Sequence, residues 1–143
     1  MMRFEGRVFK QGRYWAIEVP VLGLVTQGRT KKDALAMIAD AIESLVNREG
    51  FRAEVFPGKG ETFEVGAQDQ PALTALLLRR QRVLSGLSLA EVAKRLGASS
   101  LNAYARYEQG RTHPTLAQFS KLLAAVSPGG DFVLSASRRA RAG

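Results

Sequence analysis

Residues 88–110 read SLAEVAKRLGASSLNAYARYEQG, and this stretch decides the fold of the C-terminal half of the chain. Its first part carries apolar residues at helical spacing, which form one stripe: Leu89, Val92, Ala93 and Leu96. Ser88 and Glu91 have the spacing of a capping box, which fixes where the helix starts, and Gly97 is placed to end it. The pattern predicts a short amphipathic helix that stops at a tight turn.

A second short helix is predicted directly after that turn, with Ser100 as its N-cap and as a further DNA-binding candidate. Three residues are expected on the face that packs inward: Ala103, Tyr104 and Tyr107. Asn102 and Arg106 are then left facing out, one helical turn apart. Two such helices joined by a turn that contains glycine are typical of a helix-turn-helix, and outward Asn and Arg side chains suit adenine and guanine in a DNA major groove.

The distribution of charge favours this interpretation over an ordinary helical hairpin. Residues 1–70 hold 10 Lys or Arg and 10 Asp or Glu, whereas residues 71–143 hold 11 and 3. The net charge of +8 therefore lies entirely in the half that carries the two helices. A basic surface beside a reading helix indicates phosphate binding. Phosphate contacts are predicted for Arg111 and for one or both of Lys94 and Arg95.

Alternating patterns in the N-terminal half predict extended strands. In YWAIEV, residues 14–19, the apolar Trp15, Ile17 and Val19 alternate with the other three residues, and residues 4–8 alternate in the same way. The Gln11-Gly12-Arg13 link between these runs predicts a hairpin. Residues 23–26 offer a short third strand, and alternation returns in FRAEVF and TFEV on either side of a PGKG turn.

One helix is predicted between these strands, opened by Thr30 and closed by Gly50. Its apolar residues recur at helical spacing: Leu35, Ile38, Ala41, Ile42 and Leu45. The order of elements predicts a small sheet with one helix packed across it. Helices follow at residues 72–84 and, opened by a second capping box, at 115–126. The whole chain is therefore predicted to be α+β.

Two domains are predicted, residues 1–66 and residues 72–143, joined by a linker at residues 67–71. The first helix of the second domain is expected to bury Leu73, Leu76, Leu77, Val83 and Leu84. DFVLS, residues 131–135, is predicted to be a lone strand. A lone strand cannot satisfy the hydrogen-bonding groups of its own backbone, so we expect it to pair with the same strand in a second copy of the chain. A homodimer or higher oligomer is therefore expected.

The composition disfavours an enzyme, and no catalytic residue, metal or cofactor is expected. The chain has no cysteine and a single histidine, His113, so neither a triad nor a two-histidine metal centre can be built within one chain. Four glutamates fall on separate predicted strands and are interpreted as solubilising: Glu5, Glu18, Glu54 and Glu64. Because neither a signal peptide nor a membrane span fits the sequence, a cytoplasmic protein is expected.

Both halves of the chain resemble parts of one known family. YWAIEVPVLGLVTQGRTKKDALAMIADAIESLV, residues 14–46, resembles the HicB antitoxin pattern, in which an alternating strand ends in VP and TQG precedes a Thr that opens an Ala-rich helix. The C-terminal stretch resembles the Cro and phage-repressor class of helix-turn-helix, and NAYARYEQG, residues 102–110, is similar to the version found on HicB antitoxins. The resemblance covers most of residues 1–126.

This resemblance implies an antitoxin of a type II toxin-antitoxin system, with a partial RNase H-like N-terminal domain that lacks catalysis. That domain would neutralise a small HicA-type mRNA-cleaving toxin by binding it, while the C-terminal domain would repress the shared operon by binding operator DNA. In the resembling repressors the position of Glu108 ties the reading helix to the next loop, so Glu108 is expected to be structural.

Two further expectations concern partners and the end of the chain. The outward member of the pair Tyr14 and Trp15 is the best aromatic candidate for a protein contact, because exposed aromatic residues favour interfaces. The arginines of the tail, Arg138, Arg139 and Arg141, are more often a solvated end than a specific DNA contact. The main alternative function is a ligand-sensing helix-turn-helix regulator whose sheet domain binds a small molecule and has no toxin partner.

Overall fold

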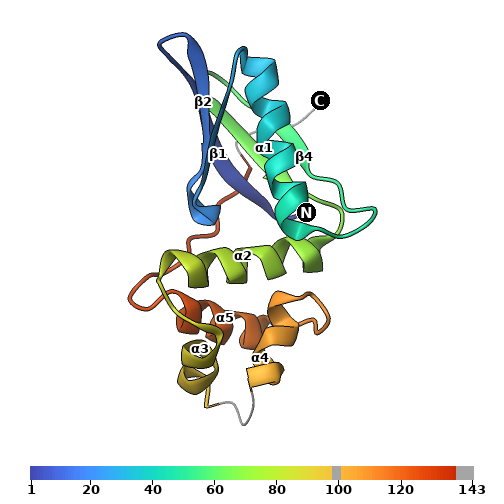
Figure 1. Ribbon diagram of the computed structural model, residues 1–143, viewed down its shortest axis with the longest axis vertical. Helices are drawn as coiled ribbons and strands as arrows, with labels where there is room; N and C mark the ends of the chain where they lie inside the picture. Colours follow the sequence, from blue (N-terminus) through green and yellow to red (C-terminus); the bar gives the residue numbers. More distant parts are fainter. Residues whose placement is uncertain (98–100, 138–143) are drawn as a thin grey trace. The chain divides into compact units, whose positions relative to one another are not determined.

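A computed structural model describes residues 1–97 and 101–137 of the chain. The chain divides into two compact units, one made of Met1–Gln70 with Leu134–Gly143 and the other of Pro71–Val133 (Figure 1). The first unit contains a β-sheet with one long helix, and the second consists of helices. The predicted α+β class is therefore confirmed. No helix in the described ranges has the length and apolar character needed to cross a bilayer.

The sheet has five antiparallel strands in the order β3-β2-β1-β5-β4. Their bounds are β1 Arg3–Gln11, β2 Tyr14–Val19, β3 Leu24–Gly28, β4 Glu54–Pro57 and β5 Thr62–Gly66. The predicted hairpin is confirmed, with Gly12 at a positive φ of 62° in the turn between β1 and β2. A short 3-10 helix at Pro20–Leu22 separates β2 from β3.

Helix α1, Lys31–Val46, packs against one face of this sheet (Figure 1). The side chain of Thr30 accepts a hydrogen bond from the backbone N–H of Asp33, so the predicted N-cap is confirmed. The predicted end at Gly50 is wrong, because the helix stops at Val46 and Asn47 adopts the left-handed conformation (φ 49°) that terminates it.

The apolar side of the sheet and α1 together form the core of the first unit. Residues of three strands and of α1 are almost fully buried in it: Phe4, Val8, Ile17, Val19, Phe63, Val65, Ala34, Ile38 and Ile42. At Gly28, the last residue of β3, a Cβ atom would collide with the backbone of Asp33 and Ala34. Glycine at this position therefore allows the first turn of α1 to lie close to the strand.

The second unit is built from four helices. Their bounds are α2 Gln70–Leu84, α3 Leu89–Arg95, α4 Leu101–Glu108 and α5 Leu116–Val126. Seven buried residues form its core: Leu78, Val92, Ala93, Tyr104, Leu122, Ala125 and Val126. The capping boxes Ser88 with Glu91 and Thr115 with Gln118 are both present as predicted. The linker predicted at residues 67–71 takes part in the fold, since Ala67 is fully buried and α2 begins at Gln70.

Three sequence-based predictions in this half are wrong. Val83 and Leu84 are about half exposed rather than buried, because they lie in the last turn of α2 just before Gly86 reverses the chain at φ 70°. Ala103, expected to face inward, is exposed. The DFVLS segment is not a strand: residues 131–137 have no regular secondary structure, because in a single described chain no strand pairs with them.

Candidate nucleic-acid interface

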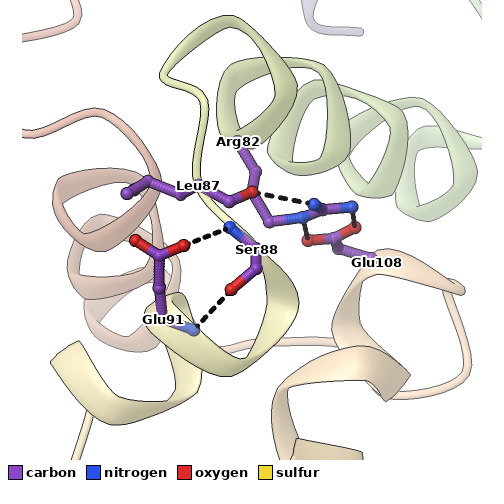
Figure 2. A network of polar contacts seen from close by, with 5 residues as sticks. All are labelled: Arg82, Leu87, Ser88, Glu91 and Glu108. Atoms are coloured by element: carbon purple, nitrogen blue, oxygen red, sulfur yellow. Dashed lines mark hydrogen bonds and ion pairs between the residues drawn. The ribbon is translucent and has the colours of Figure 1, made fainter.

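The helix-turn-helix begins with a well-defined start of α3. The Ser88 hydroxyl accepts a hydrogen bond from the Glu91 backbone N–H at 3.1 Å, and the Glu91 carboxylate accepts one from the Ser88 N–H at 3.2 Å (Figure 2). Gly97 follows the helix at φ 67°, as predicted for the residue that ends it. Ser100, the predicted N-cap of the next helix, lies outside the described residues. The local sequence thus sets where α3 starts and stops.

Helix α4 is held in place by an ion pair with α2. The Arg82 guanidinium donates from Nε to Glu108 Oε2 at 2.7 Å and from Nη2 to Glu108 Oε1 at 3.0 Å (Figure 2). Its third nitrogen, Nη1, donates to the Leu87 carbonyl at 3.0 Å, just before α3. One arginine therefore joins α2, the start of the helix-turn-helix and the end of α4, and its two parallel bonds to a carboxylate fix a defined geometry.

The Arg82–Glu108 pair is shielded from solvent, with the Glu108 side chain only 6% exposed. The hydrogen bonds to Glu108 raise the pKa of Arg82, although burial acts in the opposite direction. The expectation that Glu108 is tied to the following loop is wrong, because its partner is Arg82 in α2. The sequence offered little to reveal this, since the two residues are 26 positions apart and Arg82 lies among basic neighbours on α2.

Tyr104 is the other anchor of α4 and is 1% exposed. Its inward placement was predicted. Burial raises the pKa of the Tyr104 phenol, and the nearby Glu108 carboxylate raises it further. The Tyr104 hydroxyl makes no hydrogen bond within the part of the chain that the structure describes.

The predicted base-reading residues lie on the free side of α4. Asn102 and Arg106 are both exposed, one turn apart, while Tyr104 between them points into the core. The outward placement inferred from the sequence is therefore confirmed. Because α4 is anchored through Tyr104 and Glu108, the opposite face is presented on a rigid support, as a reading helix requires.

The predicted phosphate-binding residues differ in their surroundings. Lys94, at the end of α3, and Arg111, in the turn after α4, are both exposed. Arg95 is exposed as well, but it donates from Nε to the Ala125 carbonyl at 3.1 Å, near the end of α5. This bond gives Arg95 a structural role, so Lys94 is the better phosphate candidate of the two. The Arg111 backbone N–H donates to the Arg106 carbonyl at 3.0 Å, which places Arg111 directly beside the end of the reading helix.

The predicted protein-contact residues lie on the first unit. Tyr14, at the start of β2, is 47% exposed and Trp15 is half-buried, so Tyr14 is the outward member of the pair. His113 is exposed in the loop between α4 and α5. Within the described ranges, no group of three or more His, Asp or Glu side chains is arranged to hold a metal ion.

Comparison with known protein families identifies the same segment. Residues 78–126, from the end of α2 to the end of α5, match the family described as helix-turn-helix, of the Cro/C1 type. Neither the curated proteins nor the solved structures contain a match to the chain. The match supports a DNA-binding helix-turn-helix domain over these residues, and it includes the anchors Arg82, Tyr104 and Glu108.

Proposed function

We propose that this chain is a transcriptional repressor that reads operator DNA with α4. The observation that carries the proposal is the exposed pair Asn102 and Arg106 on a helix whose other side is fixed by Tyr104 and Glu108, within the segment that matches the helix-turn-helix family. In the proposed complex Arg106 and Asn102 contact base edges, and Lys94 and Arg111 contact phosphates. Binding of this kind depends on both sequence and salt.

We further propose that the chain is an antitoxin that represses its own operon and neutralises a HicA-type toxin. The resemblance of residues 14–46 to the HicB pattern supports this, together with the joining of a sheet unit to a helix-turn-helix in one chain. The sheet unit, partly RNase H-like in this proposal, binds the toxin without catalysing a reaction, and the exposed Tyr14 is the first candidate for that contact. The single histidine and the absence of cysteine in the sequence support a binding role over an enzymatic one.

Two experiments test these proposals separately. Sequencing of the genomic fragments that the purified chain retains is expected to recover the DNA upstream of its own gene. Retention of fragments without sequence preference would contradict the repressor proposal.

Co-expression with each neighbouring gene is expected to identify a small basic protein that is toxic alone, harmless when produced with this chain, and co-purified with it. If no neighbour is toxic, or if toxicity persists, the antitoxin proposal fails, and the ligand-sensing regulator is the alternative that remains.

The repressor is proposed to act as a dimer, because one helix-turn-helix reads only a half-site. Two copies related by a two-fold axis would place their reading helices about 34 Å apart, or a multiple of that, so the operator should be an inverted repeat. Light scattering on the full chain tests this, with a dimer or higher oligomer expected. The free chain could instead be a monomer that protects an inverted repeat only at raised protein concentration. That result would show that the dimer forms on the DNA and not in solution.

A further inference from the structure

One end of the sheet unit carries both the hairpin turn from β1 to β2 and the start of α1 (Figure 1). Lys10 of β1 stands directly opposite Trp15 of β2, and Trp15 stands directly opposite Gly28 of β3. A Cβ atom at Gly28 would point into the backbone of Asp33 and Ala34, in the first turn of α1. Because directly opposed residues share a face, Lys10 and Trp15 lie on the side of the sheet that α1 covers, beside its first turn.

The turn between β4 and β5 reaches the same end of the sheet. Lys31 Nζ donates to the Gly60 carbonyl at 3.1 Å, so the start of α1 contacts this turn. The turn is also bonded to β1, because the Val8 backbone N–H donates to the Glu61 carbonyl at 2.8 Å. Three segments that are distant in the sequence therefore meet at one end of the sheet unit.

Basic residues from all three segments gather there. We call this surface the basic end and define it by five residues: Lys10, Arg29, Lys31, Lys32 and Lys59. All of them except Lys31 are exposed, and none forms an ion pair with any residue that the structure describes. The nearby Glu61 carboxylate is paired with Arg7 at 2.9 Å. Residues 1–70 hold ten basic and ten acidic residues, yet half of the basic ones lie at this end.

The basic end combines two features that a single-stranded nucleic acid requires. Clustered positive charges repel one another and attract an anionic ligand, such as a chain of phosphates. Trp15 is half-buried, so part of its ring is open to solvent beside Lys10. Unpaired bases stack on aromatic rings of this kind, whereas the bases of a duplex are already stacked on one another. An acidic peptide would use the charges but has no base to place on the ring.

We propose that the basic end is a binding site for single-stranded nucleic acid. Trp15 stacks on a base, and the exposed cations around it contact successive phosphates: Lys10, Arg29, Lys32 and Lys59. Lys31 holds the start of α1 against the turn between β4 and β5. The site lies on the sheet unit, apart from the residues that match the helix-turn-helix family. It therefore stands whether or not the chain is a repressor or an antitoxin.

Fluorescence of Trp15 tests the proposal in the full chain, because this is the only tryptophan in the sequence and reports on the basic end. Titration with a uridine RNA or a thymidine DNA of about 12 nucleotides is expected to quench the fluorescence, since a base stacks on the indole. Tighter binding of one of the two oligonucleotides assigns RNA or DNA as the ligand. A duplex of the same length is expected to cause little quenching.

Matched double variants connect the signal to the cations. Lys10→Gln/Lys32→Gln is expected to weaken binding about tenfold in the Trp15 titration. The slope of log affinity against log salt should fall by about 1.4, because each phosphate contact on a single strand contributes about 0.7. Arg48→Gln/Arg52→Gln removes two exposed positive charges between α1 and β4 and is expected to bind like the wild type. Urea unfolding of both variants checks that they keep the fold.

Several outcomes would overturn the proposal. These are oligonucleotide binding that leaves the Trp15 fluorescence unchanged, equal weakening in the two double variants, and equal quenching by single strands and duplex. Polyglutamate that quenches as strongly as the oligonucleotides would also overturn it, and would assign the basic end to an acidic protein segment. None of these outcomes depends on operator binding by α4.

Discussion

The two units use their acidic residues in opposite ways. In residues 1–70, which form the sheet, acidic and basic residues are equal in number, and ion pairs join several of them across neighbouring strands, as in Arg3–Glu64 and Arg7–Glu18. In the helical unit, Pro71–Val133, only three acidic residues stand against eight basic ones. Two of those three serve the local fold, because Glu91 completes the cap of α3 and Glu108 binds Arg82.

This difference shows how a small basic domain keeps its charge available. The Arg82–Glu108 pair and the α3 cap take up the carboxylates that could otherwise neutralise the reading surface. Lys94, Arg106 and Arg111 are left exposed, and their charge is then free to attract phosphates. The comparison implies that the acidic residues of the helical unit control stability, while its exposed basic residues control DNA binding.

The largest expected effect comes from Arg82→Ala, which leaves the Glu108 carboxylate buried without its partner. Removal of one member of a buried pair costs about 3 kcal/mol or more, so the helical unit should unfold at much lower urea concentration. Circular dichroism follows the helices, while the single tryptophan, Trp15, reports on the sheet unit. Arg111→Ala removes the same charge from an exposed site and serves as control; equal loss in both variants would contradict the structural role.

Glu108→Gln tests the same pair from its other side. The amide keeps the shape of the side chain but loses its charge, so a smaller fall in stability is expected, on the order of 2 kcal/mol. The preference among DNA sequences should stay unchanged, which competition binding against unrelated DNA measures. A Gln variant with unchanged melting and altered operator choice would reverse the assignment.

Arg106→Ala is expected to weaken operator binding by about 2 kcal/mol and to relax sequence preference at one position. The reason is that a bidentate contact to a base edge is lost, which unrelated DNA does not make. Quantitative binding to operator and to unrelated DNA measures the difference. Arg13→Ala, a like substitution in the turn between β1 and β2, is the control. Equal losses of Arg106→Ala on both DNAs would show that Arg106 contacts phosphate.

Tyr104→Phe is expected to change the response of stability to alkaline pH. In the unfolded chain a tyrosine ionises near pH 10, whereas the raised pKa keeps Tyr104 protonated in the fold. The unfolded state then binds fewer protons, so wild-type stability should fall above pH 10 by up to about 1.4 kcal/mol per pH unit. Chemical unfolding at a series of pH values should show a shallower fall in the variant. Tyr14→Phe, at an exposed position, is the control, and parallel curves for both would contradict the account.

The smallest expected effect distinguishes the roles of two basic residues, Arg111 and Arg95. Arg111→Ala should weaken binding to all DNA sequences alike and reduce the slope of log affinity against log salt by about one unit. Arg95→Ala removes the bond to the Ala125 carbonyl, so it should lower stability by about 1 kcal/mol and leave the salt slope nearly unchanged. Salt titrations of both variants decide which of the two cations neutralises a phosphate.

Local signals in the sequence predicted a large part of this structure. The caps at Thr30, Ser88 and Thr115 and the hairpin at Gly12 follow from a few neighbouring residues, so they could be located without the fold. The placement of Asn102 and Arg106 followed from helical periodicity in the same way. Features that depend on distant residues were not predicted, including the pairing of β1 with β5 and the bond from Arg82 to Glu108.

The errors have the same origin. Val83 and Leu84 continue an apolar pattern past the point where α2 ends, and nothing in their own sequence shows which side chains are covered. The strand predicted at residues 131–135 rests on residue type alone, but a strand exists only where another strand pairs with it. The pairing of Glu5 with Glu64 was not predicted, because strand register, and not residue spacing, brings these two residues together.

The central claim is that the helix-turn-helix of residues 78–126 reads a specific DNA sequence. The most direct measurement compares binding of the full chain to the DNA upstream of its own gene with binding to a shuffled duplex of the same composition, over a range of salt concentrations. Affinity for the upstream DNA is expected to be about a thousandfold higher at physiological salt, with both affinities falling as salt rises. Equal affinity for the two duplexes at every salt concentration would contradict the account.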